Sequence, residues 1–264
     1  MKGAVDIGTF SLILGYLLLL VPVIIFIYAR VKLIRKLLIS VGRMSVQLLL
    51  VGFFLQFIFD LRNPYVTIAW LFVMLLFSSY SVLDNTRLST RFFFWPVAAG
   101  ILIANLLVLP FFTGVILSLD SILEPRYAIA LGGMLLGNSM RGNIIGLNRF
   151  FEGLKRNETR YIYSLSLGAT RYEALTPFYR HAMTEAVGPM LATTATMGIV
   201  SLPGMMTGQI LGGSSPLVAI KYQIAIMLAI FTSMTISTTT AILMAAWRSF
   251  DSRAMLKPRI WKKG

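Results

Sequence analysis

Methionine thioethers are the groups in this sequence whose type and spacing could do chemistry. Met183, Met190 and Met197 recur at every seventh residue, which places them on one face of a helix. Thioethers are soft ligands that suit a metal such as Cu(I). Methionine is also an adaptable filler of apolar interiors. The spacing therefore predicts either ordinary packing or a thioether-lined path for a soft metal.

A second chemically unusual stretch runs over residues 201–209, SLPGMMTGQ, inside an apolar region. Pro203 interrupts helical hydrogen bonding, and Gly204 loosens the turn that follows. Irregular backbone at membrane depth is tolerated only where it is buried in protein or lines a water-filled cavity. Discontinuous helices of this kind occur at transporter substrate sites. The stretch indicates either part of a substrate path or a kink that bends during gating.

Several other chemistries are excluded by what the sequence lacks. It has no cysteine and one histidine, His181, so no Ser-His-Asp or metalloenzyme constellation is evident. His181 is expected to be an ordinary interfacial residue rather than a ligand or base. No Walker A loop is present, so the chain is not expected to bind a nucleotide by that route. It is therefore not predicted to be an enzyme, and no cofactor is expected in it.

The composition places the chain among helical membrane proteins. Of its 264 residues, 57% are hydrophobic and 13% are charged, whereas soluble domains carry about 25% charged residues. Apolar runs long enough to cross a bilayer recur along it, and no nucleic-acid partner is expected. We predict an all-α, polytopic fold with a single transmembrane domain over residues 1–264. The seven expected spans are 8–28, 42–59, 65–83, 92–118, 127–147, 186–212 and 217–247.

The basic residues predict the orientation, because they gather in cytoplasmic loops. Nineteen of the 24 lysines and arginines fall in residues 29–43, 84–91, 148–185 and 248–264, and three fall in the opposite set of loops. The N-terminus is thus expected outside and the C-terminus inside. Residues 30–43 read as a basic interfacial piece that would contact membrane lipid. All ten acidic residues lie outside the spans or at their edges, which argues against an ion-driven pump.

The longest polar interval, residues 150–185, is the predicted platform for an external motor. Its middle reads as a helix, a break over residues 166–170, and a second helix. Gly168 permits a backbone turn that other residues resist. Thr170 is expected to cap the next helix, with Glu173 completing a capping box. The residues expected to couple this segment to an ATPase are Leu167, Gly168, Ala169, Thr170, Arg171 and Glu173.

Three motifs resemble the FetB family of bacterial ABC permeases, the iron exporters, which includes the plant aluminium-sensitive proteins. The first is Ser40 to Arg43 followed by Gln47, and the second runs from Gly133 to Met140. The third, the most specific, is residues 201–208 continuing to 219–223. The platform itself resembles the coupling loop of ABC permeases. With the earlier observations, the candidate substrate-path residues are Pro203, Gly204, Met205, Met206, Gln209, Asn138, Met140 and Gln47.

The resemblance implies a homodimeric permease in a bacterial inner membrane. It further implies two copies of a separate ATPase subunit, which would bind ATP and Mg²⁺, and iron export as the process. Iron(II) prefers imidazole and carboxylate ligands, however, and the predicted spans offer neither. A chelated metal, a nucleotide sugar or another organic solute therefore stays open as cargo. The alternative from another class is a membrane receptor or scaffold whose basic loops hold anionic lipid or a signalling partner.

Overall fold

The computed structural model describes residues 6–61, 63–251 and 254–262, and this part of the chain is helical with no strand. The all-α prediction is thereby confirmed. Lys2, Arg62, Arg253 and Lys263, which entered the orientation argument, lie outside the described residues. The helices are α1 (Thr9–Gly15), α2 (Leu20–Tyr28), α3 (Ile34–Leu61), α4 (Pro64–Asp84), α5 (Thr90–Phe111), α6 (Pro125–Arg156), α7 (Glu158–Ser166), α8 (Arg171–Thr196), α9 (Gly204–Leu211) and α10 (Pro216–Ser249). Shorter turns of 3-10 or π type cover Tyr16–Leu19, Phe112–Ile116 and Pro258–Ile260.

Five helical segments in the described residues are long and apolar enough to cross a membrane. They are Thr9–Tyr28, Ile34–Leu61, Pro64–Asp84, Thr90–Ile116 and Pro216–Ser249. Helices α6 and α8 reach 32 and 26 residues but are more polar. A helix of either length exceeds the roughly 20 residues that a bilayer requires. Whether α6 and α8 also cross the membrane, which would complete the seven predicted spans, stays a prediction.

Two predicted boundaries differ from the structure. The basic piece over residues 30–43 is not a separate interfacial helix, because α3 runs without interruption from Ile34 to Leu61. No proline lies within it to stop the helical hydrogen bonding. The predicted span 186–212 is two helices, α8 and α9, separated by residues 197–203.

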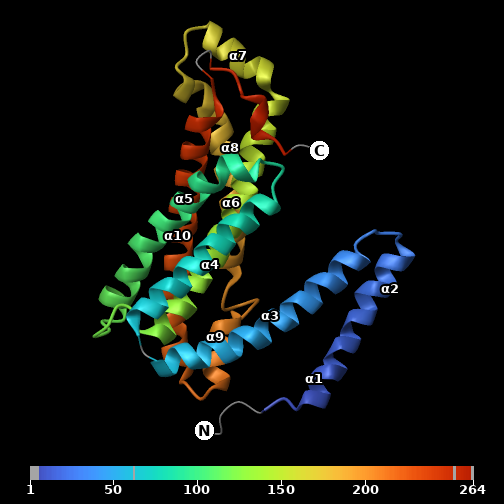
Figure 1. Ribbon diagram of the computed structural model, residues 1–264, viewed down its shortest axis with the longest axis vertical. Helices are drawn as coiled ribbons and strands as arrows, with labels where there is room; N and C mark the ends of the chain where they lie inside the picture. The colour runs from blue at the N-terminus through green and yellow to red at the C-terminus, as the bar shows by residue number, and fades with distance from the viewer. Residues whose placement is uncertain (1–5, 62, 252–253, 263–264) are drawn as a thin grey trace.

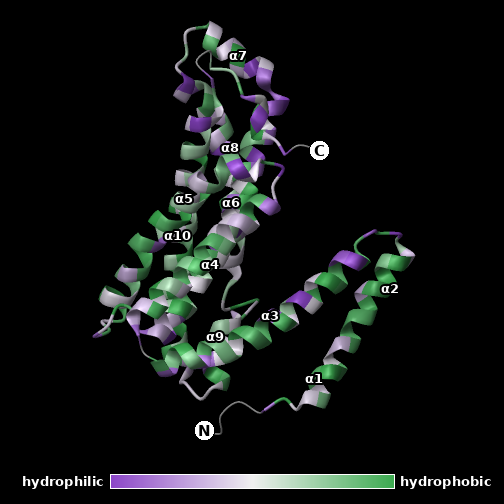
Figure 2. Ribbon diagram, viewed as in Figure 1, coloured by the Kyte–Doolittle hydropathy of each residue, from purple (hydrophilic) through white to green (hydrophobic). Residues whose placement is uncertain are grey.

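The body of the molecule is a bundle of α4, α5, α6, α8 and α10, while α1–α3 project from it as an arm (Figure 1). No residue of α1 or α2 is buried, and their side chains are almost entirely apolar. Figure 2 shows this apolar character along the arm, whereas polar residues gather around α7 and at the α2–α3 turn. An exposed apolar arm in a membrane protein is expected to lie in lipid.

Helix α10 packs against α5 and α6 at glycines that bring the backbones close together. A Cβ atom on Gly100 of α5 would lie 2.8 Å from the Ser237 carbonyl oxygen and 3.0 Å from the Ala241 nitrogen. On α6, Gly142 and Gly146 face the side chains of α10 in the same way. Small residues at such positions allow helices to approach in a membrane. The small-residue spacing on α6 thus serves packing within the chain.

A line of polar groups joins α6 and α10 inside the bundle. The Ser139 and Ser233 hydroxyls lie 3.2 Å apart, and the Asn143 amide donates to the Ser237 hydroxyl at 2.7 Å. These residues are fully buried. Hydroxyl groups on a helix often bond to carbonyl groups of their own helix. Ser233 and Ser237 instead stabilise the contact between two helices.

The close contact at Gly100 predicts a specific defect. Replacing Gly100 with Ala forces α5 away from α10, because the new methyl group would collide with backbone atoms. We expect a loss of about 1–3 kcal/mol, typical of overpacking, measured as a lower melting temperature in detergent. The control is Gly137→Ala, where a Cβ meets no atom within 4 Å. Equal melting temperatures for the two variants would contradict this packing.

Candidate functional site

The polar segment at the end of the bundle has the predicted helix, break and helix. Helix α7 ends at Ser166, and the chain reverses at Gly168, whose φ is +91°. That value lies in the left-handed region, which glycine adopts at no steric cost. Leu167 is 70% exposed at the tip of the turn. The segment therefore presents an exposed apolar side chain on a defined turn at the end of the bundle.

Thr170 and Glu173 form a capping box at the start of α8. The Thr170 backbone N–H and hydroxyl donate to the Glu173 carboxylate at 2.8 and 2.7 Å, and the Glu173 N–H donates to the Thr170 hydroxyl at 3.3 Å. The bonds from the Thr170 side chain and backbone lower the pKa of the Glu173 carboxyl. The two bonds to the carboxylate are thus fully formed at neutral pH and weaken as the pH falls through that lowered pKa.

The C-terminal tail holds α7 in place. The Tyr161 hydroxyl donates to the Ala254 carbonyl at 2.9 Å, and the Tyr161 ring packs against Phe250 at 5.5 Å between centroids. Burial raises the pKa of the Tyr161 phenol, so the hydroxyl keeps its proton near neutral pH. Farther along, the Ile260 carbonyl accepts from Ser89 N–H at 2.8 Å. The tail therefore connects α7 to the α4–α5 loop.

A basic cleft of about 260 Å³ lies beside α7, between α6 and α8. Arg149, Arg156, Arg160 and His181 line it together with Glu152. Arg149 is also paired with Glu185 at 3.5 Å, and both side chains are largely exposed. His181 thus lies among arginines at the surface. This position agrees with an ordinary interfacial role for His181 but does not test it.

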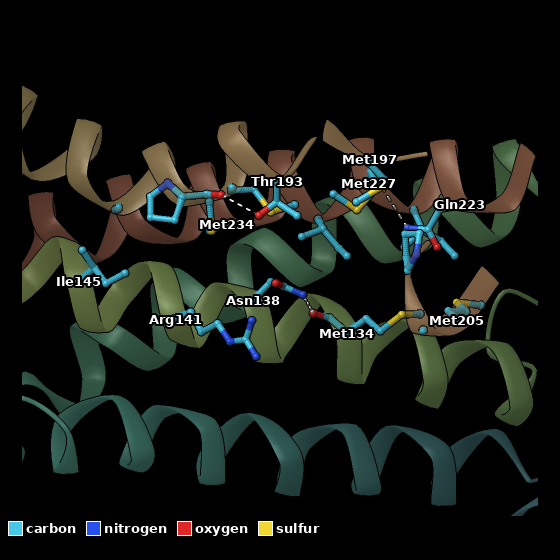
Figure 3. Close-up of a pocket in the computed structure, with 17 residues that line it drawn as sticks. Met134, Asn138, Arg141, Ile145, Thr193, Met197, Met205, Gln223, Met227 and Met234 are labelled. Atoms are coloured by element: carbon cyan, nitrogen blue, oxygen red, sulfur yellow. Dashed lines mark hydrogen bonds between the residues drawn. The ribbon is translucent and has the colours of Figure 1, made fainter. Parts of the chain in front are cut away.

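A larger cavity, of about 450 Å³, lies between α6, α8, the start of α9 and α10 (Figure 3). Helix α6 lines it with one stripe, Met134, Asn138, Arg141 and Ile145. These residues are spaced by three or four positions, so they share a helix face. Helices α8 and α10 contribute stripes of the same kind. The cavity therefore lies where one face of each of these three helices meets the others.

Thioethers dominate the cavity wall, with a few polar groups among them. The methionines are Met134, Met190, Met197, Met205, Met227 and Met234. The Gln223 amide nitrogen lies 3.9 Å from the Met197 sulfur as a weak donor, and the Asn138 amide donates to the Met134 carbonyl at 2.9 Å. In the described part of the chain, the Gln223 Oε1 atom has no hydrogen-bond partner although it is buried. The wall thus combines soft apolar groups with an unused acceptor.

The chain leaves helical geometry at the cavity, earlier than predicted. Helix α8 ends at Thr196, Gly198 turns with φ +89°, and Pro203 becomes the N-cap of α9 with Gly204 as its first residue. Gly204 therefore does not loosen a helical turn. Proline without an N–H is well tolerated at a helix start, where that donor would have no partner. The positive-φ glycine at 198 is the feature that the sequence reading missed.

The structure brings together four of the eight residues predicted for the substrate path. Asn138, Pro203, Gly204 and Met205 line the cavity. The other four do not line it. Met206 is buried on α9, and the buried Oε1 atom of Gln209 has no partner among the described residues. Met140 packs against the apolar core at the α7 end, and Gln47 is exposed on α3. Their roles stay predictions.

Sequence reading missed most of the cavity wall. Of the three heptad-spaced methionines, Met190 and Met197 line the cavity, whereas Met183 accepts a hydrogen bond from the Thr239 hydroxyl at 3.8 Å. The feature of the sequence that could have indicated these wall residues is their helical spacing, over residues 134–145 on α6 and 223–234 on α10. Helical spacing shows that residues share a face, but not which faces meet. Arg141, which was not among the residues predicted for the substrate path, also lines the cavity.

The described residues contain no group of three histidine, cysteine, aspartate or glutamate side chains that could hold a metal ion. What the arrangement offers is a cavity within a helical bundle, with a structured polar segment at one end. The fold and these features define a polytopic helical membrane protein with a cavity between its helices.

Comparison with known proteins identifies the family. The profile of the Uncharacterised protein family (UPF0014) matches residues 9–250, so the chain belongs to that family. It is 34% identical to the UPF0014 membrane protein YjkA of Bacillus subtilis, over 80% of this chain and 82% of the relative. It is 33% identical to the protein ALUMINUM SENSITIVE 3 of Arabidopsis thaliana, over 89% and 84%. No solved structure matches the chain significantly.

A further relative carries a functional name. The chain is 29% identical to the "Probable iron export permease protein FetB" of Escherichia coli, over 93% of both chains. The predicted family is confirmed by this match, by the plant relative and by the profile. The region matched by the profile includes both the polar segment and the cavity.

The cavity predicts a difference in water access between two neighbouring residues of α8. Both residues are exposed, but Thr193 lines the cavity, whereas Leu191 does not. Since the chain has no cysteine, single Thr193→Cys and Leu191→Cys variants can be compared directly. We expect a charged methanethiosulfonate reagent to modify Cys at 193 several-fold faster, because ionised reagents do not enter lipid. Equal modification rates in the two variants would show that water does not fill the cavity.

Proposed function

We propose that this chain is the membrane permease subunit of an ABC transporter that exports iron or a related metal species. The whole of residues 1–264 acts as one transmembrane unit. A separate subunit, in two copies, binds and hydrolyses ATP with Mg²⁺. This chain carries no cofactor of its own. Each part of the proposal has its own support.

The turn at Gly168 is the observation that carries the proposal. It is exposed, capped by Thr170 and Glu173, and braced through Tyr161 by the tail. Helix α8 then runs without interruption from Arg171 to the cavity wall at Thr193. A force applied to the turn is therefore transmitted along one helix to the cavity. Leu167, Ala169 and Arg171 complete the surface that docks into the ATPase.

The cargo assignment has weaker and separate support. The relative from Escherichia coli is named as an iron export permease. The cavity supplies a volume for cargo next to the broken helix, which is where transporters place substrate sites. Substrate-path roles are proposed for Asn138, Pro203, Gly204 and Met205, with Met206 and Gln209 behind them. Met140 and Gln47 lie away from the cavity and are proposed only as indirect contributors.

A homodimer is proposed because one side of the cavity region lacks protein cover. Ile199 and Val200 are 92% and 77% exposed beside the cavity. Gly204 and Gly208 of α9 meet no atom within 4 Å of a Cβ position. Irregular backbone over residues 197–203 cannot face lipid without unsatisfied polar groups. A second copy packed there would cover this backbone and complete the cavity.

The membrane is proposed to be the plasma membrane of a bacterium, with the α7 end in the cytoplasm. The charge asymmetry supports this orientation, and two of the relatives are bacterial. A receptor or scaffold would need neither a cavity in its core nor a helix that joins it to the exposed turn. Those two features favour the transporter.

The orientation predicts which side of the membrane reaches two exposed serines. Ser166 precedes the Gly168 turn, and Ser214 lies between α9 and α10 at the opposite end of the bundle (Figure 1). In intact cells an impermeant maleimide should label the Ser214→Cys variant, and it should label Ser166→Cys only after permeabilisation. The reverse pattern would place the proposed docking turn outside and would rule out an ATPase there.

The coupling role predicts the effect of a side chain at Gly168. A Gly168→Val variant strains the backbone, because a β-branched residue is highly unfavourable at a φ of +91°. We expect the stimulation of ATP hydrolysis by the permease to fall to the basal rate of the ATPase subunit. The control is Gly188→Ala on α8, where a Cβ meets no atom within 4 Å. Full stimulation in a folded Gly168→Val variant would refute the coupling assignment.

A further inference from the structure

Arg141 is a cation in the wall of the cavity without a matching anion. It lies midway along α6, beside Asn138 (Figure 3). The ion pair found among the described residues is Arg149 with Glu185, so Arg141 has no carboxylate partner there. All ten acidic residues of the chain are described, and none lines this cavity. The cavity therefore carries a net positive charge.

The position of Arg141 along α6 makes this charge informative. It follows Pro125 by sixteen residues, which corresponds to about 24 Å along the helix at 1.5 Å per residue. Helix α6 packs along α4 and α10, both of which are long and apolar enough to span a membrane. The Arg141 residue is exposed, and ionisable side chains within membrane-spanning helices usually face a water-filled cavity and mark a substrate or ion pathway. An arginine side chain keeps its positive charge in proteins.

A fixed positive charge selects the charge of what binds. A bare Fe²⁺ ion beside a guanidinium group is repelled, and the thioethers are poor ligands for iron. An anion is instead attracted, and guanidinium groups bind carboxylates with two parallel hydrogen bonds. A negatively charged cargo would supply the partner that Arg141 lacks.

The size of the cavity and a second polar group also favour an organic cargo. A volume of about 450 Å³ is that of a site for a small organic molecule. Gln223 is 7% exposed, and its Oε1 atom has no partner among the described residues. An orphan acceptor in a buried site is costly unless a ligand or water donates to it. A hydroxyl group or a metal-bound water could donate there.

We propose that the cavity takes its cargo as an anionic organic complex, a hydroxycarboxylate chelate of ferric iron, and that Arg141 selects it by pairing with a carboxylate. Gln223 accepts a hydrogen bond from a hydroxyl group or a coordinated water of the same complex. The methionines surround the organic part as adaptable apolar contacts. This inference rests on the proposed function, because it concerns the cargo of the same cavity.

The binding test uses the full-length permease in lipid nanodiscs without the ATPase. The probes are radioactive ferric citrate, citrate alone, UDP-glucose, and Fe²⁺ under anaerobic conditions, each measured by equilibrium binding. The variants are Arg141→Gln, which removes the charge, and Arg141→Lys, which keeps it. The matched control is Arg126→Gln, an exposed arginine on the same helix that does not line the cavity. Size-exclusion profiles and melting temperatures show that each variant is folded.

We expect wild type to bind ferric citrate more tightly than Fe²⁺, citrate or UDP-glucose. Arg141→Gln should weaken this binding by about tenfold, equivalent to about 1.4 kcal/mol. Arg141→Lys should retain binding within about threefold, and Arg126→Gln should bind as wild type does. Binding of ferric citrate to wild type should weaken when the salt concentration is raised from 50 to 500 mM. Binding to Arg141→Gln should not depend on salt in this way.

Three results would overturn the inference. One is no binding of ferric citrate to wild type. Another is undiminished binding by Arg141→Gln, which would show that Arg141 only extends to the membrane surface. The third is tighter binding of Fe²⁺ or UDP-glucose than of the chelate. Failure of the proposed function would look different: Arg141-dependent binding would persist while the Gly168 turn had no effect on ATP hydrolysis.

Discussion

Close contact between α10 and its two neighbours is the constraint on which the rest of the structure depends. At Gly100 the α5 and α10 backbones approach so closely that no Cβ fits without displacement. Gly142 and Gly146 bring α6 up to the other side of α10. Since lipid supplies no hydrophobic force between helices, such packing and the buried polar contacts must hold the bundle together. The cavity exists because these contacts fix the rotation of α6 and α10.

Helix α8 connects the two ends of the functional apparatus. It begins at the capping box of Thr170 and Glu173, lines the cavity with residues up to Thr193, and ends at Thr196. Its first residues belong to the polar segment, whereas its last turns belong to the bundle. The C-terminal tail holds α7 through the hydrogen bond from Tyr161. One continuous helix, with Pro177 and Pro189 inside it, joins a braced turn to a cavity and is a direct route between them.

The cavity combines properties that rarely occur together at membrane depth. Six thioethers give it a soft, adaptable wall, while Arg141 gives it a fixed charge and Gln223 an unused acceptor. A wall made for packing alone would contain neither polar group, because each is costly when it lacks a partner. The combination makes sense for a cargo that has an apolar surface and a negative charge. Ordinary packing explains Met183, but it leaves the wall as a whole unexplained.

What the sequence determined by itself was local. The apolar runs set the helical membrane class, because an unpaired backbone cannot cross lipid. The turn at Gly168 and its capping box were predictable, since they depend on residues no more than five apart. The sequence predicted that a helix break lies near Pro203, but it did not predict that the break begins at Met197. That start depends on Gly198 and on the packing of α8 against its neighbours.

Only the tertiary structure decided which helix faces meet. Met134, Arg141 and Gln223 looked like separate polar or apolar positions on different helices, and the fold gathers them into one cavity. Gln47 looked equally suited to the path, but it lies on an arm away from the cavity. Periodicity specifies the face on which a side chain lies within its own helix. The partner of that face depends on the close approaches between helices, which arise only when the whole bundle packs.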